Sequence, residues 1–83
     1  MPSSGQVKFK DIKAMLDICA PGAVIEPKLH HTWITYNGLT YRGLPLGKHG
    51  NRKNPEIEVG HVKRMARFFE LLPCAKREIA ALG

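Results

Sequence analysis

Apolar residues between positions 9 and 20 recur on one face of an α-helix. They follow the spacing i, i+3, i+7, i+10, and charged residues fill the other faces. The apolar positions are Phe9, Ile12, Leu16 and Cys19. Ser3 and Ser4 precede this run as candidate N-caps, and Pro21-Gly22 follows it as a stop signal. The pattern predicts an amphipathic first helix.

Two β-prone runs after this helix flank an Asn-Gly pair. HTWITY (31–36) precedes Asn37-Gly38, LTYRGLPL (39–46) follows it, and a shorter run, AVIE (23–26), comes before both. Asn-Gly is the strongest short-range signal for a hairpin, because a type I′ turn needs positive φ at both central residues. We therefore predict three strands, with a tight turn at 37–38.

The position of this turn predicts which residues of the hairpin face one another. One face is apolar, with the opposed pairs Ile34 with Tyr41 and Tyr36 with Leu39. On the other face Trp33 lies directly across from Arg42. The members of this second face are His31, Trp33, Thr35, Thr40 and Arg42. It is amphipathic and partly cationic.

The second half of the chain begins with a loop and ends in helical patterns. Residues 46–56 are rich in glycine, asparagine and cations, and a brief extended segment follows at 56–58. From Gly60 onward, HVKRMARFFELL carries an apolar stripe formed by Val62, Met65, Phe69 and Leu72. Pro73 ends that helix, and CAKREIAAL (74–82) predicts a short last helix.

Together these elements predict an α+β fold. Their order is α-β-β-β-α over residues 2–72, with an additional C-terminal helix at 74–82, and the 83 residues make one domain. We expect a two-layer arrangement in which helices cover one face of the sheet and leave the other face open.

Composition also allows a prediction of the protein's cellular location. Hydrophobic residues at 43% and charged residues at 24% are ordinary for a globular protein. We expect no membrane contact and a cytoplasmic location, because no apolar run approaches about 20 residues and the first ten residues lack an apolar signal-peptide region. In that compartment Cys19 and Cys74 are expected to be reduced, with a disulfide between them as the alternative.

The net charge of +6 is unevenly distributed. Residues 42–67 contain seven cations and two acids, a net of +5, whereas residues 1–41 carry +1 and residues 68–83 are neutral. Clustered cations favour a polyanion such as RNA or DNA, or an acidic protein partner. The alternative is a solvated basic face that serves solubility.

Two further motifs are His30-His31, followed by the aromatic Trp33, and IEVGHVKRMARFF (57–69), which follows the basic loop. Together with the first helix and the short strand after it, these stretches resemble HicA-type toxins. The resemblance runs from about Ser3 to Phe69. It implies a fold like that of double-stranded-RNA-binding domains, mRNA interferase activity, and inhibition by a HicB-like antitoxin.

The same resemblance implies a catalytic histidine. Leu29-His30-His31 occupies the place of the family's Gly-Ser-His stretch, so the catalytic role falls on His30, and Trp33 takes the aromatic position. Two features depart from the family pattern. Lys28-Leu29 replaces the small Gly-Ser pair, and the loop at 47–55 is longer than usual. Either change could belong to a member that binds RNA without cutting it.

The candidate chemistry is RNA cleavage without a metal ion. It requires a base for the 2′-hydroxyl, an acid for the departing 5′-oxygen, and cations beside the charge that develops on the phosphate. Histidine suits the acid and base roles, because its pKa lies near neutrality. The candidates are His30 and His31. Strand alternation places His31 with Trp33 and His30 with Ile34, so a half-buried, structural His30 is the alternative.

The candidate RNA-binding residues combine cations with one aromatic ring. They are Lys28, Trp33, Arg42, Lys48, His49, Arg52, Lys53, Lys63 and Arg64. Trp33 could stack on a base, cover Arg42, or pack under the last helix. His61, in the first turn of a helix, could face a bound anion or simply be exposed. Structural zinc sites use closely spaced ligand pairs, but the adjacent His30 and His31 would point to opposite faces of a strand, so we expect no metal or other cofactor.

The sequence thus predicts an RNA-binding protein that resembles a HicA-type toxin and acts as a metal-independent mRNA endoribonuclease. Its expected partners are mRNA and a HicB-like antitoxin. Two alternatives stay open: a non-catalytic nucleic-acid-binding protein of phage origin on the same fold, and an interaction module for an acidic partner.

Overall fold

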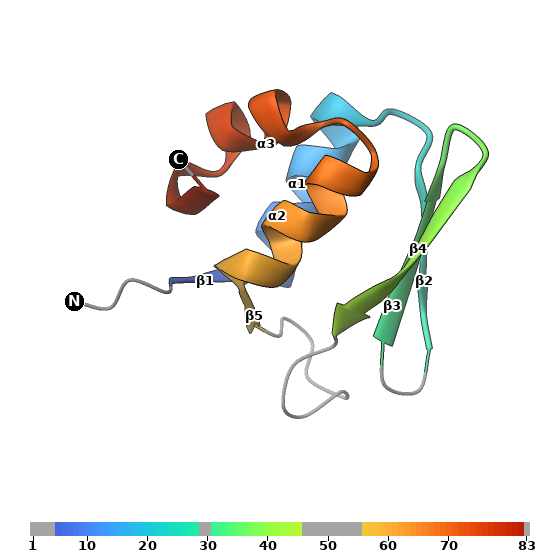
Figure 1. Cartoon of the computed structure of the whole chain (residues 1–83), viewed down its shortest axis with the longest axis horizontal. Helices are drawn as coiled ribbons and strands as arrows, with labels where there is room; N and C mark the ends of the chain where they lie inside the picture. The colour runs from blue at the N-terminus through green and yellow to red at the C-terminus, as the bar shows by residue number, and fades with distance from the viewer. Residues whose placement is uncertain (1–4, 29–30, 46–55, 83) are drawn as a thin grey trace.

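Three antiparallel strands form the main sheet, and helices cover one of its faces (Figure 1). The structure is a computed structural model that describes residues 5–28, 31–45 and 56–82. The strands lie in the order β2 (Val24–Pro27), β3 (His31–Tyr36) and β4 (Leu39–Pro45). The helices are α1 (Phe9–Cys19), α2 (Val59–Phe68) and α3 (Leu72–Glu78), followed by the short 3₁₀ helix η1 (Ala80–Leu82). The predicted α+β class is confirmed.

A second, two-stranded sheet joins the start of the chain to the segment before α2. β1 (Gln6–Lys8) pairs antiparallel with β5 (Glu56–Glu58), and Val7 and Ile57 face one another in the core. Strand β1 was not predicted. Its presence also contradicts the predicted N-cap, because α1 begins at Phe9 and the extended Lys8 takes the N-cap position.

The hairpin between β3 and β4 turns where the sequence predicts. Asn37 and Gly38 have φ values of 55° and 80°, as a type I′ turn requires. The predicted pairs are also present: Ile34 with Tyr41 and Tyr36 with Leu39. Beyond Ile34 the register shifts by one residue, since Thr32 pairs with Leu44. This shift is a β-bulge on β4, and the sequence reasoning did not anticipate it.

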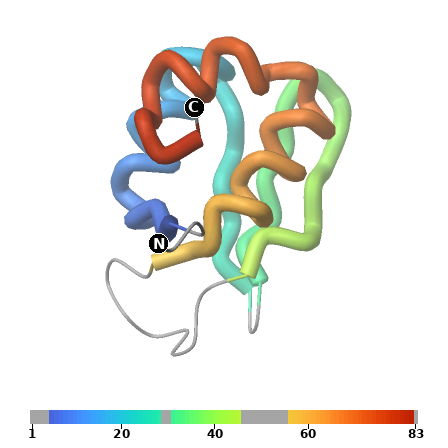
Figure 2. Tube along the Cα trace, turned by 60° about the vertical axis from the view of Figure 1, so that its left-hand side comes forward, coloured from blue at the N-terminus to red at the C-terminus, as the bar shows by residue number. Residues whose placement is uncertain are grey.

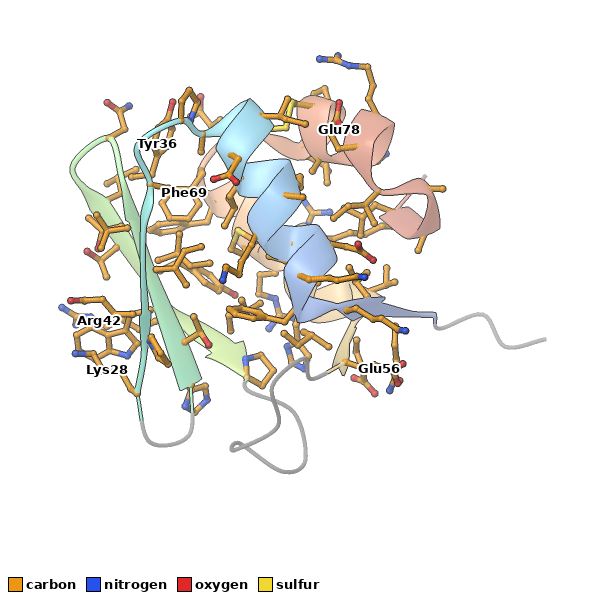
Figure 3. The ribbon with its side chains drawn as sticks, turned by 180° about the vertical axis from the view of Figure 1, so that it is seen from behind. Lys28, Tyr36, Arg42, Glu56, Phe69 and Glu78 are labelled. Carbon is orange, nitrogen blue, oxygen red and sulfur yellow. A yellow bond between two sulfur atoms is a disulfide. The ribbon has the colours of Figure 1, made fainter. Side chains whose placement is uncertain are left out.

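The core lies between the main sheet and the helices. Ile34 and Leu44 from the sheet are fully buried, as are Ile12 of α1 and Met65 of α2. An aromatic cluster closes one end of this layer, where the ring centroids of Tyr36 and Phe69 lie 6.1 Å apart (Figure 3). Burying one face of β3 in this way sends its alternate side chains to the opposite face.

The C-terminal segment is packed onto the other helices. α3 contacts both α1 and α2, and η1 contacts α2 (Figure 2). Helix α2 ends at Phe68, four residues earlier than predicted, and Pro73 lies in the first turn of α3, where its missing N–H costs no hydrogen bond. Among the described residues, no helix is long and apolar enough to cross a membrane.

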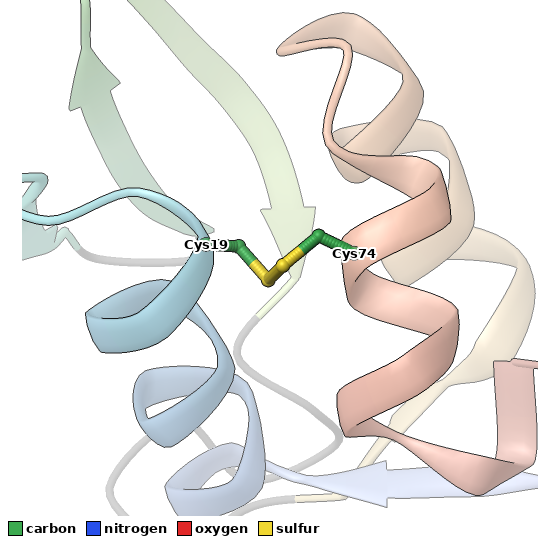
Figure 4. Close-up of a disulfide and its surroundings, with 2 residues drawn as sticks. All are labelled: Cys19 and Cys74. Atoms are coloured by element: carbon green, nitrogen blue, oxygen red, sulfur yellow. A yellow bond between two sulfur atoms is a disulfide. The ribbon is translucent and has the colours of Figure 1, made fainter.

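A disulfide ties this segment to the first helix. The Sγ atoms of Cys19, the last residue of α1, and Cys74 in α3 are 2.04 Å apart (Figure 4). The prediction of reduced thiols is therefore wrong. The two cysteines are separated by 55 residues, and only the packing of α3 against α1 brings their Cα atoms to 5.9 Å. A cross-link over so long a loop restricts the unfolded chain strongly.

We predict that the Cys19→Ser/Cys74→Ser double variant unfolds with a free energy about 4 kcal/mol lower than the wild type, the loop-entropy value for a closure of about 55 residues. Urea denaturation followed by circular dichroism measures the difference. A thiol reductant should destabilise the wild type by a similar amount and leave the double variant unchanged. Equal stability of both proteins without reductant would contradict the prediction.

A second prediction concerns Thr32, whose Oγ1 is buried and has no hydrogen-bond partner among the described residues. Thr32→Val keeps the side-chain shape and removes the buried hydroxyl, so we expect the free energy of unfolding to rise by about 1 kcal/mol. Thr35→Val is the matched control. The Thr35 Oγ1 lies 3.0 Å from the Thr40 Oγ1, so its loss should lower stability slightly. Destabilisation by Thr32→Val would show that this hydroxyl is hydrogen-bonded.

Candidate nucleic-acid interface

The face of the main sheet that points away from the helices carries the candidate site, and we call it the open face. Thr32 and Ile34 are fully buried on the helix side of β3, so His31, Trp33 and Thr35 lie on the open face. His31 is exposed, and the other two side chains are half-buried. This alternation confirms the prediction that groups His31 with Trp33.

Trp33 contacts two cations on this face. The Lys28 Nζ and the Arg42 Cζ each lie 4.7 Å from the centroid of its ring. Lys28 directly follows β2 and Arg42 belongs to β4, so the cations come from the two sides of the central strand. Figure 3 shows both on the side of the sheet away from the helices, which contradicts packing of Trp33 under the last helix.

The contact between Trp33 and Arg42 depends on the bulge in β4. Ile34 pairs with Tyr41 but Thr32 pairs with Leu44, so Arg42 and Gly43 together oppose Trp33. In a regular strand, residues 41 and 44 would point to opposite faces. The extra residue allows Leu44 to be fully buried on the helix side while Arg42 stays exposed on the open face.

The strand register places a carboxylate beside the two cations. Glu26 pairs with Trp33 across β2 and β3 and is exposed. Glu26 is not among the residues that the sequence predicts for the site. Extending the pairing of β3 back onto the 23–26 run could have revealed it. With Lys28 and Arg42, Glu26 leaves a net charge of +1 from these three side chains.

His31 stands at the start of β3, two residues before Trp33 on the same face. Its carbonyl oxygen accepts a hydrogen bond from the Lys28 N–H at 2.7 Å, which holds the Lys28 backbone against the start of this strand. A strand rises about 3.3 Å per residue, so the His31 and Trp33 Cα atoms are separated by about 6.6 Å. His30, the first choice for catalysis, lies outside the described residues.

The two remaining candidates that the structure describes do not lie on the open face. Lys63 and Arg64 belong to α2, which lies on the other side of the sheet (Figure 1). The described cations of the basic window therefore do not form one surface. Four further candidates lie outside the described residues, namely Lys48, His49, Arg52 and Lys53.

His61 has a carboxylate as its neighbour. It lies in the first turn of α2, where its Nε2 is 3.8 Å from the Glu58 Oε1. A negative group at this position competes with any anion for the helix N-terminus, so an anion site at His61 is disfavoured. Among the described residues, no group of three or more histidine, cysteine or acidic side chains is placed to hold a metal ion.

A cavity of about 350 Å³ lies elsewhere, between β1, α1 and the C-terminal segment. Asp11 and Glu78 line it together with apolar side chains such as Met15. Two carboxylates repel phosphate, so this cavity does not extend the candidate RNA interface.

The open face can act on a nucleic acid in two ways. A base stacked on tryptophan gains about 1–3 kcal/mol, whereas an exposed cation–π contact contributes about 0.5–1 kcal/mol. A base can therefore displace a cation from the Trp33 ring, and the released cation is then free to contact a phosphate. His31 supplies an accessible imidazole at the end of the same row.

Comparison with known proteins gives no independent support for a family. No protein-family model matches this chain, and no curated protein or solved structure does either. The resemblance to HicA-type toxins therefore stays a prediction from the sequence.

Proposed function

We propose that this chain binds RNA and cleaves mRNA without a metal ion, as its resemblance to HicA-type toxins implies. The observation that carries the proposal is the open face, where an exposed imidazole, one indole ring and two cations lie together, free of the helices. Such a combination of aromatic and cationic side chains is typical of surfaces that bind single-stranded nucleic acid.

The proposed reaction is a transesterification within the RNA chain. A histidine acting as base removes the proton of a 2′-hydroxyl, and the 2′-oxygen attacks the adjacent phosphorus. The bond from phosphorus to the 5′-oxygen breaks, and a protonated group supplies a proton to that oxygen. His30 is the first choice for this acid–base work, and His31 is the second. Lys28 and Arg42 would stabilise the phosphate charge.

The three-stranded sheet β2–β3–β4 follows α1 and precedes α2, with β5 between β4 and α2, and this arrangement supports a fold like that of double-stranded-RNA-binding domains as part of this proposal. The proposal also includes inhibition by a HicB-like antitoxin with an acidic surface and a cytoplasmic location for this protein. A disulfide is unusual in a reducing cytoplasm. The location and the redox state of Cys19 and Cys74 should therefore be examined together in cell extracts.

We predict that His30→Ala lowers the rate of RNA cleavage by about 10²–10⁴-fold and changes RNA affinity only a few-fold, since acid–base groups contribute mainly to the transition state. Cleavage of end-labelled RNA in the presence of EDTA measures the rate, and induced expression tests for growth arrest. His61→Ala, on α2, is the matched control and should cleave normally.

The alternatives give different results in the same assay. Full cleavage by His30→Ala together with loss in His31→Ala would move the chemistry to His31. Binding without any cleavage by the wild type would refute the enzymatic proposal and support the non-catalytic alternative. Growth arrest that occurs with the wild type and persists in both His30→Ala and His31→Ala would also contradict the enzymatic proposal.

A further prediction concerns charge on the open face. Arg42→Gln should weaken RNA binding and reduce the slope of log affinity against log salt by about 0.7, the value for one phosphate contact to a single strand. Glu26→Gln should strengthen binding, because it removes a negative charge beside Trp33. Fluorescence anisotropy over a salt series measures both effects. Lys63→Gln, on the other side of the sheet, is the control, and a larger effect there would place the interface on α2.

A further inference from the structure

The side chains around Trp33 leave the indole accessible along the sheet. Its neighbours on the open face include Thr35 and Thr40, whose hydroxyl oxygens lie 3.0 Å apart, Val24, which pairs with Thr35 and is 53% exposed, and the exposed Glu26, which pairs with Trp33. The helices lie on the far side of the sheet (Figure 1). Two flexible side chains, those of Lys28 and Arg42, lie against the half-buried ring.

An indole on a flat surface can stack on an unpaired base but not on a paired one. Bases inside an RNA duplex are stacked on both faces and present only their edges, whereas bases of a single strand can splay out onto aromatic side chains. We propose that Trp33 is a base-stacking platform that selects unpaired RNA and fixes the position of cleavage relative to the stacked base. This inference rests on the proposed function.

The two cations would hold the phosphates on either side of the stacked base. Lys28 and Arg42 reach the ring from opposite neighbours of β3, so the departure of one from the ring leaves the other in contact. A single strand that crosses β3 at Trp33 would pass Lys28 on one side and Arg42 on the other. In the absence of RNA, the same two side chains would pack on the indole of Trp33. After a base stacks on the ring, they would bind the phosphates of the RNA backbone.

The distance along β3 would set where the chain is cut. His31 precedes Trp33 by two residues on the same face, about 6.6 Å along the strand. With the acid–base work on His31, the second choice above, a base on Trp33 would leave the adjacent phosphodiester near this end of β3. The cut would therefore fall at a fixed offset from the stacked nucleotide.

The test compares an unstructured oligoribonucleotide that carries one 2-aminopurine with a hairpin of the same length. Binding to the wild type should quench the 2-aminopurine fluorescence and favour the single strand by about tenfold or more, the effect of one stacked base. Trp33→Leu keeps apolar bulk without a ring, and it should lose the quenching and about tenfold of the single-strand affinity. Trp33→Phe keeps a ring and should retain most of both. Thr40→Ala is the surface control.

Cleavage products give a second readout. The wild type should cut at one fixed offset from the 2-aminopurine, and Trp33→Leu should cut at scattered positions. Equal affinity for single strand and hairpin, or unchanged quenching in Trp33→Leu, would overturn the inference. RNA cleavage by the wild type in the same experiment would still support the proposed function. If quenching depends on Trp33 but no RNA is cleaved, Trp33 is a base-stacking platform that does not position a cut. That result would also refute the proposed cleavage activity. Absence of RNA binding by the wild type would overturn both.

Discussion

The burial of one face of the main sheet against α1 and α2 is the constraint on which the rest of the structure depends. Ile34 and Leu44 are fully buried there, and burial of side chains of this size contributes about 1.5–3 kcal/mol each. Because strand side chains alternate, covering this face leaves His31 and Trp33 on the other. The candidate site is thus a consequence of the packing on the opposite side of the same strand.

The bulge in β4 allows this strand to bury side chains in the core and still place a cation on the open face. Both Tyr41 and Leu44 lie toward the helices, and their odd spacing is incompatible with a regular strand. Accommodating one extra residue there keeps Arg42 exposed and opposite Trp33. A local irregularity required by packing therefore also positions a cation that the proposed function uses.

Charge and the disulfide show how tertiary contacts change the interpretation of the sequence. The basic window at 42–67 is divided between opposite sides of the main sheet, with Arg42 on the open face and Lys63 on α2. Glu26, distant along the chain from the basic window, lies next to Trp33. Cys19 and Cys74, which the composition suggested were reduced, are joined because α3 packs against α1. In each case, proximity in space overrides proximity in sequence.

The sequence by itself determined the features that depend on local periodicity and turn chemistry. These are the first helix, the Asn37-Gly38 turn, the pairing of Ile34 with Tyr41, and the grouping of His31 with Trp33 on one face. Tertiary structure decided the features that depend on long-range packing: the pairing of β1 with β5, the register shift beyond Ile34 and the disulfide. The physical reason is that a turn or a helical stripe is specified by neighbouring residues, whereas the β1–β5 pairing and the disulfide join segments far apart in the chain, and the register shift follows from burying Leu44 against the helices.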